Sequence, residues 1–422
     1  MINDAIKQEF LDILKEELIP AMGCTEPIAL AYVGAKARDV LGCEPERIIA
    51  RCSGNIIKNV RCVRIPNSDG MIGVEAAVAL GVIGGDATKA MEVLEDVTDA
   101  QIARTKELLA AQRCKVEFLE SEIPLHIIVE LCKGEEEVLV EIQNTHLNIT
   151  RIIKNGENIF TSGSGKEQKV KANRTNLNVD NIKEFADTIE IRTIKKLIDK
   201  QIRCNMDIAY EGMSGDYGVG IGKTIKECYH EGVVTRMKAY TSAASEARMD
   251  GCDMPVIINS GSGNQGIASS VPVIVYAREK NIGAEKLYRA LVFSSLLTIY
   301  QKEFIGKLSA FCGAVSASCA AGAAITYMIG GTSEQIKNTV GNTLANIPGI
   351  ICDGAKVSCA AKIATSLDAS MMSHYLAMQG RAYKAYTGIL KEEAGETISC
   401  VGYIGKVGMQ QTDKEIIKIM LQ

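Results

Sequence analysis

The stretch 308–333, LSAFCGAVSASCAAGAAITYMIGGTS, carries no charged residue and consists largely of Gly, Ala, Ser and Cys. A membrane-spanning helix of ~20 residues is normally much more apolar than this stretch. Small side chains on every face instead predict a helix buried in a protein interior, where neighbouring helices pack against it closely. The stretch therefore predicts part of a large, mostly helical domain.

The rest of the chain predicts an α+β protein: a large, mostly helical C-terminal domain plus a smaller module with an antiparallel sheet. Apolar residues recur at every second position over 115–119, 126–131, 137–142 and 148–153, which predicts an antiparallel meander with one buried face. We predict N-terminal helices over 1–48, the α+β module over 49–178 and the helical domain over 179–422, with 162–178 as a linker. Further helices are expected near 180–211, 235–250, 265–280, 284–302, 333–346 and 356–379.

Composition narrows the class of protein. The chain has 422 residues, 47% of them hydrophobic and 23% charged, which fits a globular protein of two or three domains. A net charge of −4 without a basic stripe gives no support to nucleic-acid binding. The first residues alternate charges with apolar positions as in an amphipathic helix, not a signal peptide. Fourteen cysteines in such a chain predict a reducing cytoplasm rather than a disulfide framework.

Three cysteines stand in stretches where small residues let the backbone approach another group: Cys24, Cys312 and Cys352. Each has a glycine within two positions. Three thiolates would hold three corners of an iron–sulfur cube and leave the fourth iron open to a substrate. Spacing alone does not select them, because Cys319 and Cys359 are separated by the same number of residues as Cys312 and Cys352.

Two Gly- and Asn-containing loops are candidates for binding a small anion. Residues 258–266, INSGSGNQG, precede an apolar helical run, so their amides and hydroxyls could bind a carboxylate or phosphate. The alternative is a tight turn in which Asn264 caps the helix. Residues 53–59 could hold a carboxylate in the same way, or form a capped helix start with a solvated lysine. The candidate side chains are Ser260, Ser262, Asn264 and Gln265 in the first loop, and Asn55 and Lys58 in the second.

Other familiar chemistries find little support. The stretch 218–224 ends like a P-loop, but its first glycine would fall on Tyr217. The chain has no C-x-x-C and no G-x-S-x-G, and its four histidines are scattered. Only His374 follows the helix after Cys352, near the expected chemistry.

Five stretches of the sequence resemble, in the same order, the iron–sulfur L-cysteine desulfidase family, which is related to the α-chain of iron–sulfur L-serine dehydratases. The resemblance covers essentially the whole chain. It implies a [4Fe–4S] cluster held by Cys24, Cys312 and Cys352, and it decides against Cys319 and Cys359. The chain ends Met-Leu-Gln, whereas some serine dehydratases end in a cysteine that caps the open iron. The five stretches are 23–31, 53–55, 259–266, 311–313 and 349–356.

The implied reaction is the conversion of L-cysteine to pyruvate, ammonia and sulfide without pyridoxal phosphate. An open iron would act as Lewis acid on the leaving sulfur, and a protein base would take the Cα proton. Candidates for the base are Asp353, Lys356 and His374. The alternatives are an L-serine dehydratase on the same cluster, a cluster-bearing redox sensor and a cofactor-free binding protein. We expect a small-molecule substrate, no nucleic acid and no membrane partner, with a homo-oligomer left open.

Overall fold

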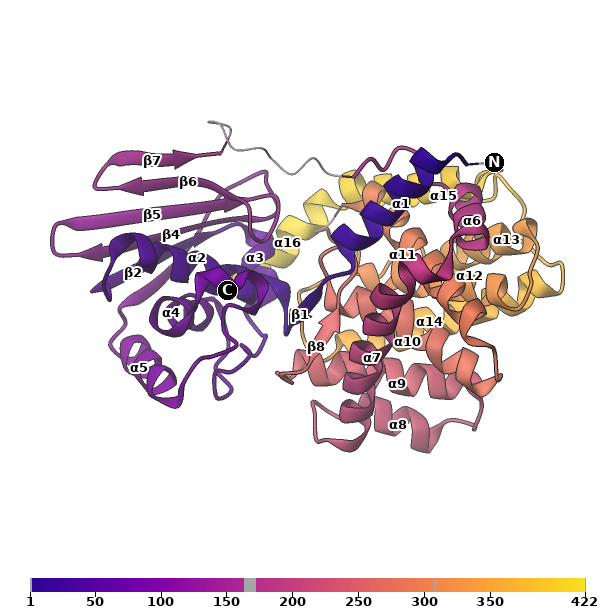
Figure 1. Cartoon of the computed structure of the whole chain (residues 1–422), viewed down its shortest axis with the longest axis horizontal. Helices are drawn as coiled ribbons and strands as arrows, with labels where there is room; N and C mark the ends of the chain where they lie inside the picture. Colours follow the sequence, from indigo (N-terminus) through magenta and orange to yellow (C-terminus); the bar gives the residue numbers. More distant parts are fainter. Residues whose placement is uncertain (1, 163–171, 307–308, 422) are drawn as a thin grey trace.

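The computed structural model describes residues 2–162, 172–306 and 309–421. Two bodies lie side by side, a sheet covered by helices and a larger helical body (Figure 1). Each has its own hydrophobic core. The predicted α+β class is confirmed. The middle of the predicted linker, 163–171, lies outside the described residues.

The sheet is mixed rather than purely antiparallel. In the described part of the chain it has six strands in the order β3-β2-β4-β5-β6-β7. Of the predicted meander, β4, β5 and β6 pair antiparallel as expected, and β7, which was not predicted, extends it; β3, predicted as its first strand, instead pairs parallel to β2 at the opposite edge. A parallel partner requires a long crossover, and three α-helices and one 3₁₀ helix between β2 and β3 supply it. The strands are β2 (Arg47–Cys52), β3 (Cys114–Phe118), β4 (His126–Lys133), β5 (Glu136–Gln143), β6 (Ile149–Lys154) and β7 (Glu157–Thr161).

Two helices, α2 and α4, cover one face of this sheet and form its core. Ile48, Ala50 and Cys52 of β2 point into that core, while Arg51 lies between them on the other face and pairs with acidic side chains. This alternation is the predicted period of two. The helices of this body are α2 (Thr25–Leu41), α3 (Gly54–Val60), α4 (Val74–Gly84), the 3₁₀ helix η1 (Ala87–Glu92) and α5 (Asp99–Ala110).

The helical body is built around α12 (Gly313–Met328), which is buried along nearly its whole length. Close packing depends on its small residues, because a methyl group on Gly322 would lie 2.0 Å from Ser370 Oγ. Among the described helices, none combines the length and hydropathy of a membrane span. The surrounding helices are α6 (Val179–Thr188), α7 (Ile191–Ser214), α8 (Ile221–Cys228), α9 (Val233–Met249), α10 (Gly263–Glu279), α11 (Ala284–Ile305), α13 (Ser333–Asn346), α14 (Cys359–Met378) and α15 (Ala394–Tyr403).

Three helix boundaries differ from the sequence-based expectation. The helix predicted over 180–211 is two helices, divided at Ile189 and Glu190. The helix expected from 308 begins only at Gly313, because residues just before it pair with the 350–352 segment instead. The sequence after Cys24 predicts Thr25 as the N-cap of a helix with Pro27 in its first turn, but Thr25 is the first residue of α2 and Cys24 occupies the N-cap.

Both ends of the chain join the two bodies. The helix α1 (Asp4–Glu17) packs into the helical core, whereas α2 packs on the sheet. Between them, β1 (Pro20–Met22) pairs with β8 (Pro255–Ile257). At the other end, a short π-helical turn η2 (Ile404–Gly408) leads into α16 (Gln410–Leu421), which reaches from the helical body to α3 (Figure 1). The domain boundaries at 48/49 and 178/179 stay predictions.

Candidate functional site

Several helices begin at one place between the two bodies. Cys24 is the N-cap of α2, Cys312 is the N-cap of α12, and Cys359 is the first residue of α14. Neither N-cap cysteine makes a side-chain capping hydrogen bond. A helix N-terminus carries partial positive charge and favours a thiolate or another anion.

A short backbone pairing sets Cys312 beside Cys352. Phe311 and Ile351 form an antiparallel bridge. The Cys312 amide donates to Ile350 O at 2.8 Å, and the Cys352 amide donates to Ala310 O at 2.7 Å. Two cysteines 40 positions apart therefore face each other because their backbones are paired.

The two thiols titrate as a pair. A hydrogen bond from Cys312 lowers the pKa of Cys352 to about 6 against the opposing effect of burial, and the Lys58 and Lys362 charges lower it further. The same contact raises the pKa of Cys312 well above its ordinary range. Of the two thiols, Cys352 is therefore the one that ionises more readily, and the thiolate is the form that binds a metal.

Cys24 and Cys359 complete a group of four sulfurs. They pack together with Met249, and Cys24 Sγ lies 3.9 Å from Met249 Sδ. Burial raises the pKa of Cys24 to about 12, although Arg248 opposes this shift. A charged Cys359 would raise the pKa of both Cys24 and Cys312, so it lies within electrostatic reach of both. We call Cys24, Cys312, Cys352 and Cys359 the cysteine group.

The structure separates the two cysteines that spacing left open. Cys359 belongs to the cysteine group. Cys319 lies seven positions after Cys312, about 10 Å further along α12, where it is fully buried and hydrogen-bonds with the Thr343 side chain. The pair Cys319 and Cys359 is therefore not brought together.

The predicted anion loop lies beside the cysteine group. Asn259 and Ser262 bond to each other across Ser260 and Gly261, both of which have positive φ, as in a type I′ turn. The Thr25 hydroxyl donates to Gly261 O at 2.9 Å and so ties the loop to the start of α2. The Ser260 hydroxyl is used within the loop, donating to Asn259 Oδ1.

The remaining loop candidates lie at the start of α10. Ser262 is its N-cap but makes no capping bond. Asn264 Oδ1 accepts from Ser245 and from Arg248. The Gln265 side chain lies against Gly313, next to Cys312, and its Oε1 is buried without a hydrogen-bond partner. This end of the loop therefore keeps unsatisfied polar atoms close to the cysteines.

The other predicted loop contributes α3. Asn55 Oδ1 is buried and has no partner. Lys58 is 2% exposed and donates to Asp413 of α16 at 2.5 Å, so its charge is already neutralised. Its carbonyl lies so close to Gly354 that a methyl group there would be 2.1 Å from it. A cavity of about 380 Å³ opens beside Lys58, lined by Cys62, Asp353, Ala355, Lys356, Ile416, Ile419 and Met420.

The three candidate bases occupy two different places. Asp353 lies next to the cysteine group and accepts from Lys356 and Lys362; these hydrogen bonds outweigh burial and lower its pKa to about 2. A carboxylate held ionised by two lysines is a weak base. His374 lies 15 positions after Cys359 on α14, about 22 Å along the helix, where Thr326 contacts its Nδ1. The structure does not bring His374 to the cysteines.

Two residues at the site were missed from the sequence. Arg248 hydrogen-bonds to Asn264 and its charge acts on Cys24 and Cys359. Glu26, whose charge raises the pKa of Cys24, accepts from Thr25 and Asn59. No local signal in the sequence marks Arg248, because Arg236, Lys238 and Glu246 are charges in the same helix.

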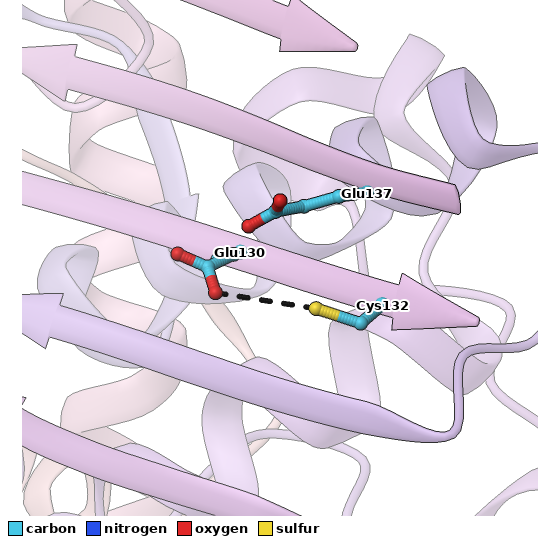
Figure 2. A group of neighbouring side chains, drawn as sticks. All are labelled: Glu130, Cys132 and Glu137. Carbon is cyan, nitrogen blue, oxygen red and sulfur yellow. Dashed lines mark hydrogen bonds between the residues drawn. The ribbon is translucent and has the colours of Figure 1, made fainter. Parts of the chain in front are cut away.

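A second group of metal-type ligands lies on the open face of the sheet. Figure 2 shows Glu130 and Cys132 on one strand beside Glu137 on the next. Arg51 donates to Glu130 at 2.9 Å, and Arg47 donates to Cys132 Sγ at 3.3 Å. Two guanidinium groups thus supply the positive charge that a metal ion would bring.

The P-loop-like stretch is occupied by the protein's own carboxylates. The amides of Val219 and Ile221 donate to Glu246 at 2.8 and 2.7 Å, and the amide of Gly218 donates to Asp250. Negative side chains lie where a phosphate would have to bind.

Comparison with known proteins gives a consistent result. Residues 88–418 match the family model described as serine dehydratase alpha chain. The match includes Cys312, Cys352 and the 259–266 loop, whereas Cys24 and Asn55 precede it. A UPF0597 protein of Lachnoclostridium phytofermentans is 47% identical over 98% of this chain and 99% of its own. UPF0597 proteins of Desulfitobacterium hafniense and Treponema denticola are 46% and 44% identical, over 99% and 98% of this chain and 98% of each relative.

Proposed function

Because this chain belongs to the serine dehydratase alpha-chain family, we propose that it is a [4Fe–4S]-dependent lyase that converts L-cysteine to pyruvate, ammonia and hydrogen sulfide. The observation that supports this proposal is that Cys24 packs with Cys359, while the Cys312 and Cys352 pair also lies within electrostatic reach of Cys359, although Cys24 is far from all three in the sequence. A reducing cytoplasm suits such a site, since the structure contains only free thiols among its described cysteines.

The residues present fit an iron–sulfur cluster. Thiolates are the ligands such clusters require, and helix N-termini at Cys24 and Cys312 favour the charged form. The glycines beside the sulfurs allow close approach of other parts of the chain, including Gln265, whose buried Oε1 still lacks a partner. When bound, the cluster would supply a Lewis-acidic iron to polarise the leaving group.

The chain's own residues would hold the amino acid and take its proton. In the elimination the Cα–H and Cβ–S bonds break, the Cα–H electron pair forms the Cα=Cβ bond, and sulfur leaves with its own pair. The resulting aminoacrylate then hydrolyses to pyruvate and ammonia. Asn55 and Gln265 offer unsatisfied amide oxygens to the substrate amine. Lys58 is paired with Asp413, so its charge, which also lowers the pKa of Cys352, is not free for the substrate.

Glu26 is the acceptor we favour for the Cα proton. It stands two positions after Cys24, and no cation pairs with it in the described part of the chain. Its partners, Thr25 and Asn59, orient the carboxylate without neutralising it. Asp353, by contrast, is bound by two lysines.

L-Serine is the second candidate substrate, since the family description itself names serine. The same elimination would then release water in place of hydrogen sulfide. Turnover of each amino acid by one anaerobic preparation separates the two: sulfide from cysteine favours the first candidate, and faster pyruvate formation from serine favours the second.

The test of the proposal is anaerobic purification followed by iron and sulfide analysis and a cysteine assay. We expect about four irons per chain, cysteine-dependent sulfide release, and loss of both in Cys312→Ala. Cys319→Ala is the matched control, because it removes a buried cysteine from the same helix outside the cysteine group. Iron and activity retained in Cys312→Ala would reject the ligand assignment. A cluster whose absorption spectrum does not change when L-cysteine is added would favour a redox sensor. Protein that contains no iron after anaerobic purification would favour a cofactor-free binding role.

A further inference from the structure

Arg248 is a buried cation without an anionic partner. The residue is 3% exposed, and within the described ranges it forms no ion pair with a carboxylate. Two other buried cations contrast with it: Lys58 pairs with Asp413, and Lys238 of the same helix pairs with Asp368. Burying a charge is costly unless it is paired, so a site of this kind is suited to an anion from outside.

The guanidinium of Arg248 lies against the first turn of α10. A methyl group on Gly263 would be 2.2 Å from its Nε and 2.5 Å from its Cζ, so only a glycine lets the two approach. Nη1 donates to Asn264 Oδ1 at 3.3 Å, which fixes the side chain. Nε is buried and has no hydrogen-bond partner. The Nε donor of the Arg248 guanidinium is thus without a hydrogen-bond acceptor at the start of α10.

The start of α10 leaves its own donors available. Ser262 occupies the N-cap without capping, and for the amides of residues 263–265 no acceptor is found among the residues that the structure describes. The helix has 17 residues, long enough for its dipole to favour an anion at this end. Free backbone amides and the Arg248 guanidinium, which lies against Gly263 and acts on Cys24, are therefore brought by two elements to the same helix start.

We propose that Arg248 and the N-terminus of α10 form the subsite for the α-carboxylate of the substrate, which makes the protein selective for 2-amino acids with a free carboxylate. A planar, forked guanidinium matches the two oxygens of a carboxylate. The identity of the amino acid rests on the proposed function, but the carboxylate subsite does not require turnover. The rival role for Arg248 is to neutralise the Cys24 thiolate, which it also contacts.

The test measures binding apart from chemistry. L-Alanine has the carboxylate and amine but no leaving group, and L-alaninamide lacks the negative charge. Anaerobic, cluster-containing wild-type protein is titrated with each, using the thermal unfolding midpoint as readout, and iron content is recorded in parallel. We expect stabilisation by L-alanine, weaker stabilisation by L-alaninamide, and a roughly 10- to 100-fold weaker L-alanine affinity in Arg248→Gln with iron retained.

Lys238→Gln is the matched control, because it removes another buried cation of α9 whose carboxylate partner is Asp368. It should bind L-alanine like the wild type. If Arg248→Gln does not fold, Arg248→Lys keeps the charge but loses the fork, and its L-alanine affinity should fall in between. Unchanged L-alanine binding in the Arg248 variants, or iron loss with binding intact, would overturn the subsite. Absence of sulfide release with Arg248-dependent L-alanine binding would instead reject the proposed function and leave the subsite standing.

Discussion

Two groups of metal-type ligands in the described residues, the cysteine group and the group on the sheet, differ in how many nearby polar atoms lack hydrogen-bond partners. On the sheet, Glu130 and Cys132 receive hydrogen bonds from Arg51 and Arg47. Beside the cysteine group, by contrast, Arg248 Nε and Gln265 Oε1 are buried without partners. Buried polar atoms are nearly always bonded in folded proteins, so such a cluster of exceptions indicates a place for a ligand.

Residues of a metal-ligating type are therefore a weak guide to a binding site. Neighbouring buried polar atoms that lack hydrogen-bond partners are a better guide. By proximity of donor atoms alone, the sheet group would rank first, since all of its ligand atoms lie within 4.8 Å of one another. When the groups are compared by the number of nearby buried polar atoms without hydrogen-bond partners, the cysteine group ranks first.

The strongest test of this comparison exchanges one cysteine in each group. Cys352→Ser should lose most of the iron and all sulfide release, since it removes the thiolate of the Cys312 pair. Cys132→Ser should keep both. Iron content and cysteine turnover in matched anaerobic preparations measure the outcome, and equal iron in the two variants would break the comparison.

The next effect concerns the ion pair that holds α16 over the site. Asp413→Asn leaves the Lys58 ammonium, 1% exposed, without a counter-charge. Loss of one partner of a buried pair costs about 3–5 kcal/mol of the free energy of unfolding. Urea denaturation measures it. Lys418→Gln, an exposed ion pair of the same helix, serves as control and should cost well under about 1 kcal/mol. A similar small cost for Asp413→Asn would contradict the prediction.

A third test uses His374, which is buried inside the helical body and hydrogen-bonded to Thr326. Burial lowers its pKa from 6.5 to about 4, so the folded protein keeps it neutral. The unfolded chain gains a proton as pH falls from 6.5 towards 4, while the folded chain does not. With respect to His374, the free energy of unfolding is therefore highest above pH 6.5. It falls by about 3 kcal/mol as the pH drops from 6.5 to about 4.

His374→Gln should flatten this acid dependence of the unfolding free energy and keep cysteine turnover at neutral pH. Unfolding curves at several pH values, with a turnover assay, provide the measurement. Loss of turnover with normal stability would return His374 to the list of catalytic candidates.

A smaller effect is expected at Cys359. As the fourth sulfur of the cysteine group, it is the internal control for the three proposed ligands. Cys359→Ser should retain iron and cost about 1 kcal/mol for placing a hydroxyl in a largely buried site. Iron analysis decides: iron loss equal to that of Cys352→Ser would make Cys359 a ligand.

The smallest effect is expected on the sheet. Glu130→Gln breaks a partly exposed pair with Arg51 and should cost about 0.5 kcal/mol. Added Zn²⁺ should not raise the unfolding midpoint of either protein. Stabilisation by zinc that disappears in Glu130→Gln would show that the sheet group binds metal after all.

Much of the fold could be predicted from period and composition. The strands from His126 to Lys154 and the buried helix after Cys312 follow local patterns that packing does not override. The parallel placement of β3 could not be predicted, because it depends on a crossover and not on the strand itself. The strands β1 and β8 were missed because three residues give no periodicity.

For the site, the stretches around Cys24, Cys312 and Cys352 were visible because glycine marks close backbone approach. Arg248 was not found, because a buried arginine and a solvated one look alike in a helical pattern. The ion pair between Lys58 and Asp413 joins residues 355 positions apart, and no local sequence pattern predicts it.

The first and last proposed ligands, Cys24 and Cys352, are separated by 328 positions. At about 5–20 residues per second, a ribosome would take roughly 16–66 s to proceed from one to the other. During that interval Cys24 stands without its partners, and the start of α2 awaits the loop at Gly261 that Thr25 binds. Insertion of a cluster would therefore follow synthesis of most of the chain, which makes the supply of iron a step in maturation and not in early folding.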